Sequence, residues 1–140
     1  MGYKQSSPGS TPDIWLGLYG CINAANAAIE GITTANASIF PSEEAKNDLI
    51  AEARCFRGFM NMQLLCYFGH WFDKADSPYG IIYRDKLSNL SNLMLDRSTV
   101  GESYQYIIDD FEYAGKYLHD YESGKFVSKQ FAKASMLSYF

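Results

Sequence analysis

The chain has 140 residues, of which 47% are hydrophobic and 16% aromatic, and its formal net charge at pH 7 is −4. This composition is that of one globular domain with a buried core, and it excludes an intrinsically disordered chain. No basic stripe is present to neutralise phosphates, which excludes nucleic acid as a partner. No apolar stretch reaches the roughly 18 residues that a membrane-spanning helix needs.

The first predicted helix follows a polar N-terminal segment. Residues 1–12 are rich in Gly, Ser and Pro, and we expect them to be disordered or added during cloning, so that the domain covers 13–140. The helix should start near Thr11, a good cap, with Pro12 in its first turn. Residues 31–41 have no helical period and are predicted to form a loop. The apolar face comprises Ile14, Leu18, Ile22, Ala25 and Ile29.

The second predicted helix begins after Ser42, a good cap, with two acidic residues in the first turn where the helix dipole favours them. It should end at Gly69. Residues 70–97 then form one long, irregular insert, which is either functional or packed down by its own apolar residues. Within it, residues 80–83 are predicted to be a short strand or extended chain. The helix has an apolar face of Leu49, Ala53, Phe56, Met60, Leu64 and Phe68.

Two further helices are predicted after the insert. The third opens with a capping box from Thr99 to Glu102, and the fourth follows a turn at 119–126 and starts after Ser128. The stripe of the third helix is Val100, Tyr104, Ile107, Phe111, Ala114 and Leu118. The predicted fold is therefore all-α, with antiparallel helical hairpins that resemble tetratricopeptide repeats without matching their consensus.

Hairpin arrays bury their faces on neighbouring units, so we expect this chain to be part of a longer protein. The fourth helix is still apolar where the sequence stops. We therefore expect an exposed patch through which the chain self-associates. The residues of this patch are Phe131, Met136, Leu137 and Phe140.

Two arginines interrupt the apolar second helix within the stretch AEARCFRGF at 51–59. At 100° per residue, Arg57 falls inside the apolar arc and Arg54 at its edge. An unpaired buried guanidinium is very costly, so Arg57 needs an acceptor. The predicted partner is Asp110, beside the stripe of the third helix, and Asn26 of the first helix faces the same constraint.

Two interpretations of these four residues are open. Arg57, Asp110 and Asn26, with Arg54 beside them, form a polar clamp that fixes the register of the helices, or they bind an anionic ligand. A buried Arg–Asp pair suits the first role. Because the pattern supplies no nucleophile nearby, the clamp is the favoured interpretation.

The remaining reactive residue types give no sign of catalysis. Cys21, Cys55 and Cys66 fall in predicted helices without a C-x-x-C pair and are interpreted as small buried hydrophobes. His70 and His119 lie on different elements without a metal-binding motif, so no metal is predicted. We expect neither a cofactor nor an enzymatic activity.

Four segments of the sequence share one order and spacing with a known family, and together they span roughly residues 13–140: IWLGLYGCINAANAAIEGI, LIAEARCFRGFMNMQLLCYFGHWF, RSTVGESYQYIIDDFEYAGKYL and GKFVSKQFAKASMLSYF. With these segments the chain resembles the SusD/RagB family of outer-membrane nutrient-binding lipoproteins of Bacteroidetes. The residues that carry the resemblance are Trp15, Tyr19, Ile22, Asn26, Glu52, Ala53, Arg54, Arg57, Phe68, Gly69, Arg97, Ser98, Tyr104, Ile107, Asp110, Ala114 and Leu118.

The resemblance implies a surface lipoprotein that binds oligosaccharides, or sometimes peptides, and covers a TonB-dependent transporter of the SusC type. In that family the helical hairpins form a scaffold that contacts the transporter, and a more irregular portion helps to make the ligand site. The sequence departs from the family in lacking the lipoprotein signal, the acylated Cys and everything beyond the fourth helix. It therefore resembles an N-terminal scaffold segment at the cell outer membrane.

Oligosaccharide binding would use aromatic rings with amide and carboxylate groups around them. Within the insert, Trp71, Asp73 and Tyr79 are the predicted ligand contacts, although Trp71 and Phe72 could instead cover the end of the second helix. The alternative function is a stand-alone helical-repeat adaptor that holds a protein partner in its groove. The insert residues of suitable type are Trp71, Phe72, Asp73, Asp76, Tyr79 and Tyr83.

Overall fold

A computed structural model describes residues 11–74, 77–124 and 126–139. These residues form α1 (Thr11–Thr34), the short 3-10 helix η1 (Ala37–Ile39), α2 (Glu43–Phe68), α3 (Val100–Tyr117) and α4 (Lys129–Tyr139), and they contain no strand. The all-α class is confirmed. Residues 80–83, which could have been a strand, are irregular.

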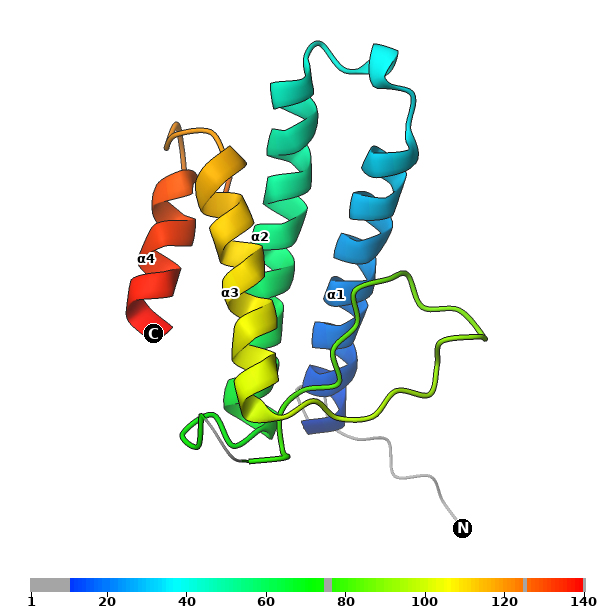
Figure 1. The fold of residues 1–140 in the computed structure, drawn as a ribbon, viewed down its shortest axis with the longest axis vertical. Helices are drawn as coiled ribbons and strands as arrows, with labels where there is room; N and C mark the ends of the chain where they lie inside the picture. Colours follow the sequence, from blue (N-terminus) through cyan, green and yellow to red (C-terminus); the bar gives the residue numbers. More distant parts are fainter. Residues whose placement is uncertain (1–10, 75–76, 125, 140) are drawn as a thin grey trace.

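The helices form antiparallel hairpins, as predicted. Helix α2 packs against α1 on one side and α3 on the other, and α4 packs against α3 (Figure 1). The insert at 70–97 leaves the lower end of α2, runs along α1, and returns to the start of α3 (Figure 1). None of the described helices combines the length and apolar character needed to cross a bilayer.

The helix ends follow the signals in the sequence. The Ser42 hydroxyl accepts from the backbone N–H of Ala45 at 3.1 Å, and the capping box between Thr99 and Glu102 is complete. Gly69 ends α2, where an added Cβ would lie 2.7 Å from the Leu65 side chain. These local signals therefore fix where α2 and α3 begin and where α2 ends.

Helix α1 starts at Thr11 with Pro12 in its first turn, as predicted, and is longer than predicted at its C-terminal end. Residues 1–10 lie outside the described residues. At the other end the helix continues to Thr34, whose hydroxyl donates to the Glu30 carbonyl at 2.8 Å. The Lys46 ammonium from α2 also donates to the Thr33 carbonyl, so a tertiary contact helps to satisfy the end of α1.

The core lies along α2 and α3. All six stripe residues of α3 are buried, as predicted. The predicted face of α2 was partly wrong, because Leu49 and Phe56 are exposed, as is Ile14 on α1. Since α2 lies between two helices, its buried face is broader and turned towards α3. It comprises Ala51, Cys55, Arg57, Gly58, Asn61, Met62, Leu64 and Leu65.

The cysteines and α4 give mixed outcomes. Cys55 is buried, which raises the pKa of its thiol to about 12, but Cys21 is half-buried and Cys66 is exposed. The prediction for Cys66 was wrong because its side chain lines an open hollow beside Trp71 and Tyr104 and not the core. On α4, Phe131 and Leu137 are exposed whereas Met136 packs against the core; Phe140 lies outside the described residues.

Candidate functional site

The four clamp residues lie together where α1, α2 and α3 meet. The Arg57 Nε and Nη2 atoms donate to the two carboxylate oxygens of Asp110 at 2.8 and 2.7 Å. Arg57 Nη1 donates to Asn26 Oδ1 at 2.7 Å, and Arg54 Nε donates to Asp110 Oδ1 at 2.8 Å. Arg57 is 5% exposed and Asp110 is fully buried.

Within the clamp the charge of Arg57 is held in place by Asp110. Burial alone would lower the pKa of Arg57, but the hydrogen bonds and the negative charge of Asp110 outweigh it and raise this pKa. Gly58 makes the close approach of α3 possible, since a Cβ there would lie 3.2 Å from the Asp110 Cβ. The Arg57 guanidinium thus finds its hydrogen-bond acceptors and its counter-charge within the chain, which supports the polar clamp over an anion site.

The clamp also holds the insert. Asn26 Nδ2 donates to the backbone carbonyls of Arg84 and Lys86 at 2.9 and 3.1 Å. The hydroxyl of Tyr19 bonds both the N–H and the C=O of Ile82, at 3.1 and 3.0 Å. Side chains on one face of α1 therefore bind the backbone of the insert, a role that no side-chain pattern in the sequence shows.

The ligand-contact candidates Trp71 and Tyr79 lie in an aromatic cluster at the end of α2. We call His70, Trp71, Phe72 and Tyr79 the aromatic edge. The His70 ring stacks on Phe72 with centroids 5.3 Å apart and lies 4.7 Å from Tyr79, and Trp71 meets Phe72 edge-on at 6.1 Å. Trp71 is 49% exposed and Tyr79 51% exposed, so both rings present surface to solvent.

Asp73, the third candidate, is exposed beside this edge, and its backbone N–H donates to the His70 carbonyl at 2.9 Å. Asp76 lies outside the described residues. Tyr83 is separate from the edge, because its ring stacks on Tyr106 of α3 with centroids 3.8 Å apart. The sequence candidates therefore divide into an exposed group and a packed tyrosine.

A cavity of about 400 Å³ adjoins the aromatic edge. The Tyr104 hydroxyl donates to the Trp71 carbonyl at 2.8 Å, which fixes the backbone of Trp71 against α3. The Lys74 ammonium lies 5.2 Å from the centroid of the Tyr104 ring. The aromatic edge thus combines exposed rings with a cavity to which Lys74 contributes a positive charge. The cavity is lined by Met62, Cys66, Trp71, Lys74, Tyr104 and Ser138.

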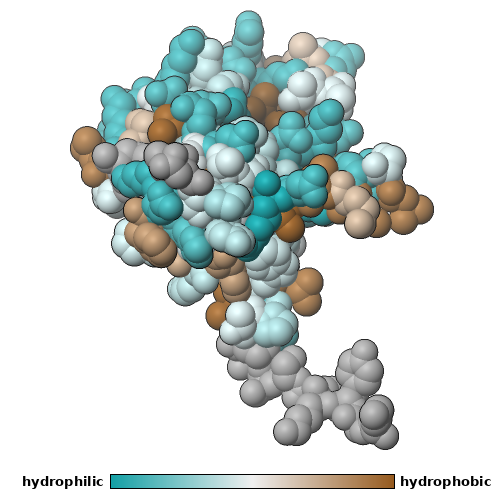
Figure 2. Space-filling model, turned by 60° about the horizontal axis from the view of Figure 1, so that its bottom comes forward, coloured by the Kyte–Doolittle hydropathy of each residue, from teal (hydrophilic) through white to brown (hydrophobic). Residues whose placement is uncertain are grey.

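The insert also carries five exposed apolar side chains within residues 87–95. We call this segment the apolar loop; the five residues are Leu87, Leu90, Leu93, Met94 and Leu95. Leu90 is 93% exposed and Met94 95% exposed, and apolar side chains gather on the protruding edge at the right of Figure 2. The guanidinium of Arg84 donates to the carbonyls of Asn92 and Leu93 at 3.1 and 2.9 Å. A shaped loop thus presents apolar side chains to solvent.

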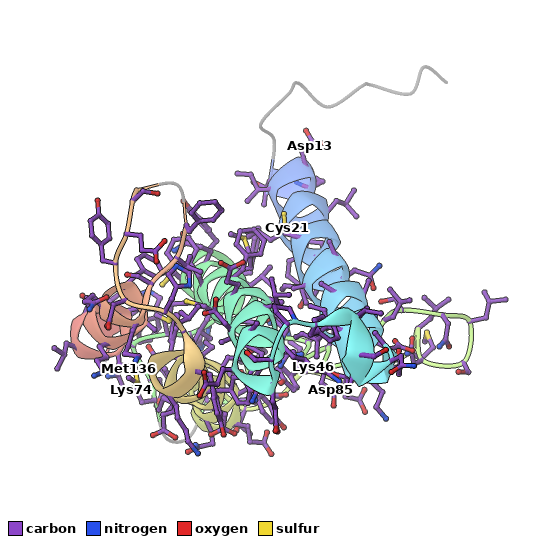
Figure 3. All side chains as sticks on the ribbon, turned by 90° about the horizontal axis from the view of Figure 1, so that it is seen from above. Asp13, Cys21, Lys46, Lys74, Asp85 and Met136 are labelled. Carbon is purple, nitrogen blue, oxygen red and sulfur yellow. The ribbon has the colours of Figure 1, made fainter. Side chains whose placement is uncertain are left out.

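Two further hollows flank α1. A polar hollow of about 470 Å³ lies between α1 and the insert, where Asp85 is labelled in Figure 3. An apolar groove of about 490 Å³ lies between α1, α2 and the turn before α4; Cys21 is labelled on its α1 side in the view down the helices (Figure 3). Leu49 and Phe56, expected in the core, line this groove instead.

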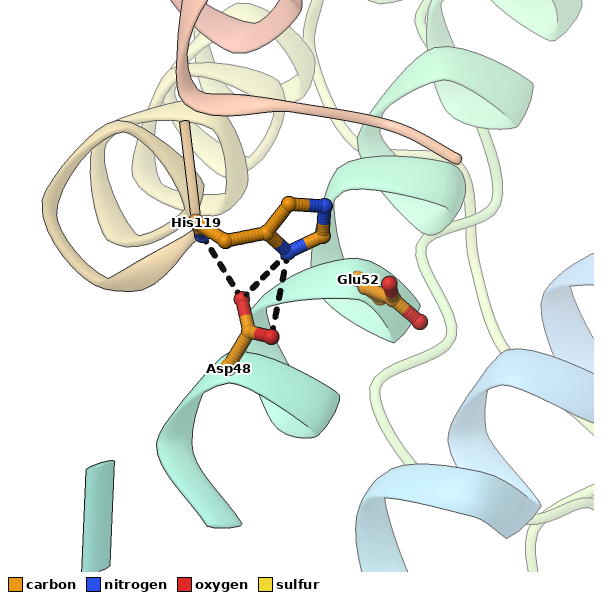
Figure 4. A group of neighbouring side chains, drawn as sticks. All are labelled: Asp48, Glu52 and His119. Carbon is orange, nitrogen blue, oxygen red and sulfur yellow. Dashed lines mark hydrogen bonds and ion pairs between the residues drawn. The ribbon is translucent and has the colours of Figure 1, made fainter. Parts of the chain in front are cut away.

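One group of side chains among the described residues could hold a metal ion, although the sequence contains no metal-binding motif. Asp48 and Glu52 of α2 meet His119, which follows α3 (Figure 4). The hydrogen bond to Asp48 raises the pKa of His119, against a smaller opposing effect of burial. The sequence separates His119 from Asp48 by 71 positions, so only the packing of α3 on α2 brings them together.

The comparisons with known proteins agree with this geometry. A sequence model of the family SusD-like_3, described as "Starch-binding associating with outer membrane", matches residues 3–140. The chain belongs to the SusD-like family. Members of this family are starch-binding proteins associated with the outer membrane, as its description states. A comparison with curated proteins finds no match.

Solved SusD-like structures share the fold. A SusD superfamily protein from Bacteroides thetaiotaomicron has a TM-score of 0.79 and 21% identity over 99% of this chain and 33% of its own. A SusD-like carbohydrate-binding protein from Bacteroides vulgatus has a TM-score of 0.76 and 20% identity over 91% of this chain and 27% of its own. The present chain thus spans a third or less of the length of these proteins.

A structure described as containing a xylogluco-oligosaccharide has a TM-score of 0.73 and 24% identity, over 91% of this chain and 23% of its own. At this identity the likeness concerns the fold. The predicted family and the predicted fold are both confirmed, with the helical hairpins as the shared part.

Proposed function

We propose that this SusD-like chain is the helical scaffold of a non-catalytic component that binds oligosaccharides at the outer membrane and docks on a SusC-type, TonB-dependent transporter. The observation that carries the proposal is the family match over residues 3–140, combined with the exposed aromatic edge at the end of α2. Surface exposure and a lipid anchor on the complete protein are part of the same proposal.

The aromatic edge suits a sugar ring for a physical reason. Pyranose rings present apolar C–H faces that stack on aromatic side chains, while their hydroxyls need hydrogen-bonding groups nearby. Trp71 and Tyr79 supply exposed rings, and Asp73 supplies an exposed carboxylate next to them. The hydrogen bond from Tyr104 to the Trp71 carbonyl limits the movement of this platform.

The experiment is a calorimetric titration of the chain with malto- and xylogluco-oligosaccharides. Because stacking on an aromatic ring is worth about 0.5–1.5 kcal/mol, Trp71→Ala should weaken binding about two- to tenfold, and Tyr79→Ala by a smaller factor. Tyr121→Ala is the matched control, since Tyr121 is also exposed, at 64%, but lies in the turn after α3. Equal binding by wild type and Trp71→Ala would contradict the assigned site.

Docking on a transporter is supported by the apolar loop. Leu90 and Met94 are almost completely exposed on a loop that Arg84 holds in shape, and fully exposed apolar anchors are typical of protein contact sites. Co-purification of the complete protein with its transporter should be lost in Leu90→Asp with Met94→Asp. Retention of the complex in this variant would contradict the docking surface.

The alternative of a helical-repeat adaptor is favoured by a different observation, the apolar groove between α1 and α2 that Phe56 lines. A protein partner whose helix filled this groove would be lost in Phe56→Asp and retained in Trp71→Ala. If the chain held such a partner and bound no oligosaccharide, the adaptor function would replace the one proposed.

A further inference from the structure

The side chains of Asp48, Glu52 and His119 lie close together at the joint between α2 and the turn that follows α3, with hydrogen bonds between Asp48 and His119 and none from either to Glu52 (Figure 4). Asp48 and Glu52 stand one helical turn apart on α2 and face the same way. His119 Nδ1 lies 3.0 Å from each carboxylate oxygen of Asp48, and the backbone N–H of His119 donates to Asp48 Oδ1 at 2.8 Å (Figure 4). One ligand atom from each of the three residues lies within 4.8 Å of the others.

These distances suit a small tetrahedral cation. With metal–ligand bonds of about 2.0–2.2 Å, the donor atoms around such an ion lie about 3.3–3.6 Å apart. The His119 Nδ1 and Asp48 carboxylate oxygens lie 3.0 Å apart, and a cation bound between them would replace the proton that Nδ1 donates to Asp48, which is released to solvent. A rotation of the Glu52 side chain would bring its carboxylate nearer. The half-buried position of all three residues leaves the fourth ligand position open to water.

The hydrogen bonds between Asp48 and His119 explain the positions of these two side chains, but they do not explain the position of Glu52. Asp48 caps the turn by accepting from both the backbone and the ring of His119. The Glu52 carboxylate is half-buried beside Asp48, and the ion pairs among the described residues, which involve Arg54, Arg57 and His119, place no lysine or arginine on it. The Glu52 carboxylate nevertheless lies within 4.8 Å of the ligand atoms of Asp48 and His119, so a cation held by those two residues would be within reach of Glu52 as well.

We propose that Asp48, Glu52 and His119 bind a divalent transition-metal ion of the zinc class, which ties α2 to the turn between α3 and α4. One imidazole nitrogen with two carboxylates is a borderline ligand set that favours Zn²⁺ over Mg²⁺ or Ca²⁺, which prefer oxygen ligands alone. The site lies apart from the aromatic edge, so its occupancy is independent of the proposed oligosaccharide binding.

The test is a calorimetric titration of the metal-stripped, untagged chain with ZnCl₂, with parallel titrations using CaCl₂ and MgCl₂. Wild type should bind one Zn²⁺ per chain, and Glu52→Gln should weaken binding at least tenfold. Glu52→Gln is the informative variant because it preserves the contact between Asp48 and His119. His119→Gln should abolish binding. The matched controls Glu30→Gln on α1 and His70→Gln at the aromatic edge should bind as wild type does.

Thermal unfolding gives a second readout, because a ligand that binds only the folded chain raises its Tm. Zn²⁺ should raise the Tm of wild type and of Glu30→Gln but not that of Glu52→Gln. The proposal is overturned if wild type binds no Zn²⁺, if Glu52→Gln binds as tightly as wild type, or if His70→Gln loses binding equally. It is also overturned if Ca²⁺ binds as tightly as Zn²⁺ and still binds to His119→Gln.

Discussion

Replacing Asp110 by alanine is expected to be among the most damaging single substitutions in this chain. The carboxylate of Asp110 accepts three hydrogen bonds of 2.7–2.8 Å from Arg54 and Arg57. Removing it leaves the guanidinium of Arg57, which is 5% exposed, buried without its counter-charge. Such a loss costs about 3–5 kcal/mol, and Arg54 adds little because its side chain is 24% exposed and can turn to water.

The assay is urea unfolding followed by circular dichroism, with unchanged m-values required for the comparison. Asp110→Asn keeps the shape and one acceptor oxygen, so it should lose less, about 1.5–3 kcal/mol. Asp109→Asn is the matched control, because Asp109 is exposed and its side chain accepts only from Gln105 within the described residues; it should change stability by less than about 0.5 kcal/mol. A loss below about 1 kcal/mol for Asp110→Ala would refute the reasoning about the clamp.

Three other substitutions or modifications probe the packing. Asn61 is fully buried with neither amide atom hydrogen-bonded to a described residue, so Asn61→Leu should raise the free energy of unfolding by about 1–2 kcal/mol; a loss of stability in the same urea assay would contradict this. Gly80→Ala should destabilise by about 1–3 kcal/mol because its Cβ would lie 2.4 Å from a backbone carbonyl oxygen, whereas Gly17→Ala on open helix surface should be neutral or stabilising; equal effects would contradict the close approach. At pH 8 a thiol reagent should modify exposed Cys66 and spare buried Cys55, and rapid modification of Cys55 in the native chain would contradict its burial. Because the pKa of Cys55 is about 12 in the folded chain and 9.0 in the unfolded chain, its thiol ionises first in the unfolded chain, and the free energy of unfolding should fall as the pH rises above 9.

The elements that could be predicted from the sequence are those fixed by local signals. The capping box from Thr99 to Glu102 and the stop at Gly69 depend on contacts between near neighbours, and both boundaries were predicted correctly. The stripe of α3 was also predictable, because this helix has a single strongly apolar face. Helix α2 packs against neighbours on two sides, so a single-stripe interpretation misassigned Leu49 and Phe56.

The parts that escaped prediction depend on contacts between distant segments. The cost of burying Arg57 pointed to an acceptor, but the carbonyls of Arg84 and Lys86 that complete the environment of Asn26 belong to the irregular insert. The meeting of His119 with Asp48 depends on how α3 lies against α2, which no spacing in the sequence shows. Functional groups supplied by an irregular backbone or by helix packing are thus the ones that sequence periodicity misses.

The most direct measurement of the central claim is a map of amide and aromatic chemical shifts while the chain is titrated with xylogluco-oligosaccharide. If the aromatic edge is the binding surface, the largest shifts will fall on Trp71 and Tyr79, with little change at Tyr121. Shifts concentrated in the apolar groove or in the polar hollow beside α1, or no saturable shift at all, would contradict oligosaccharide binding at the end of α2.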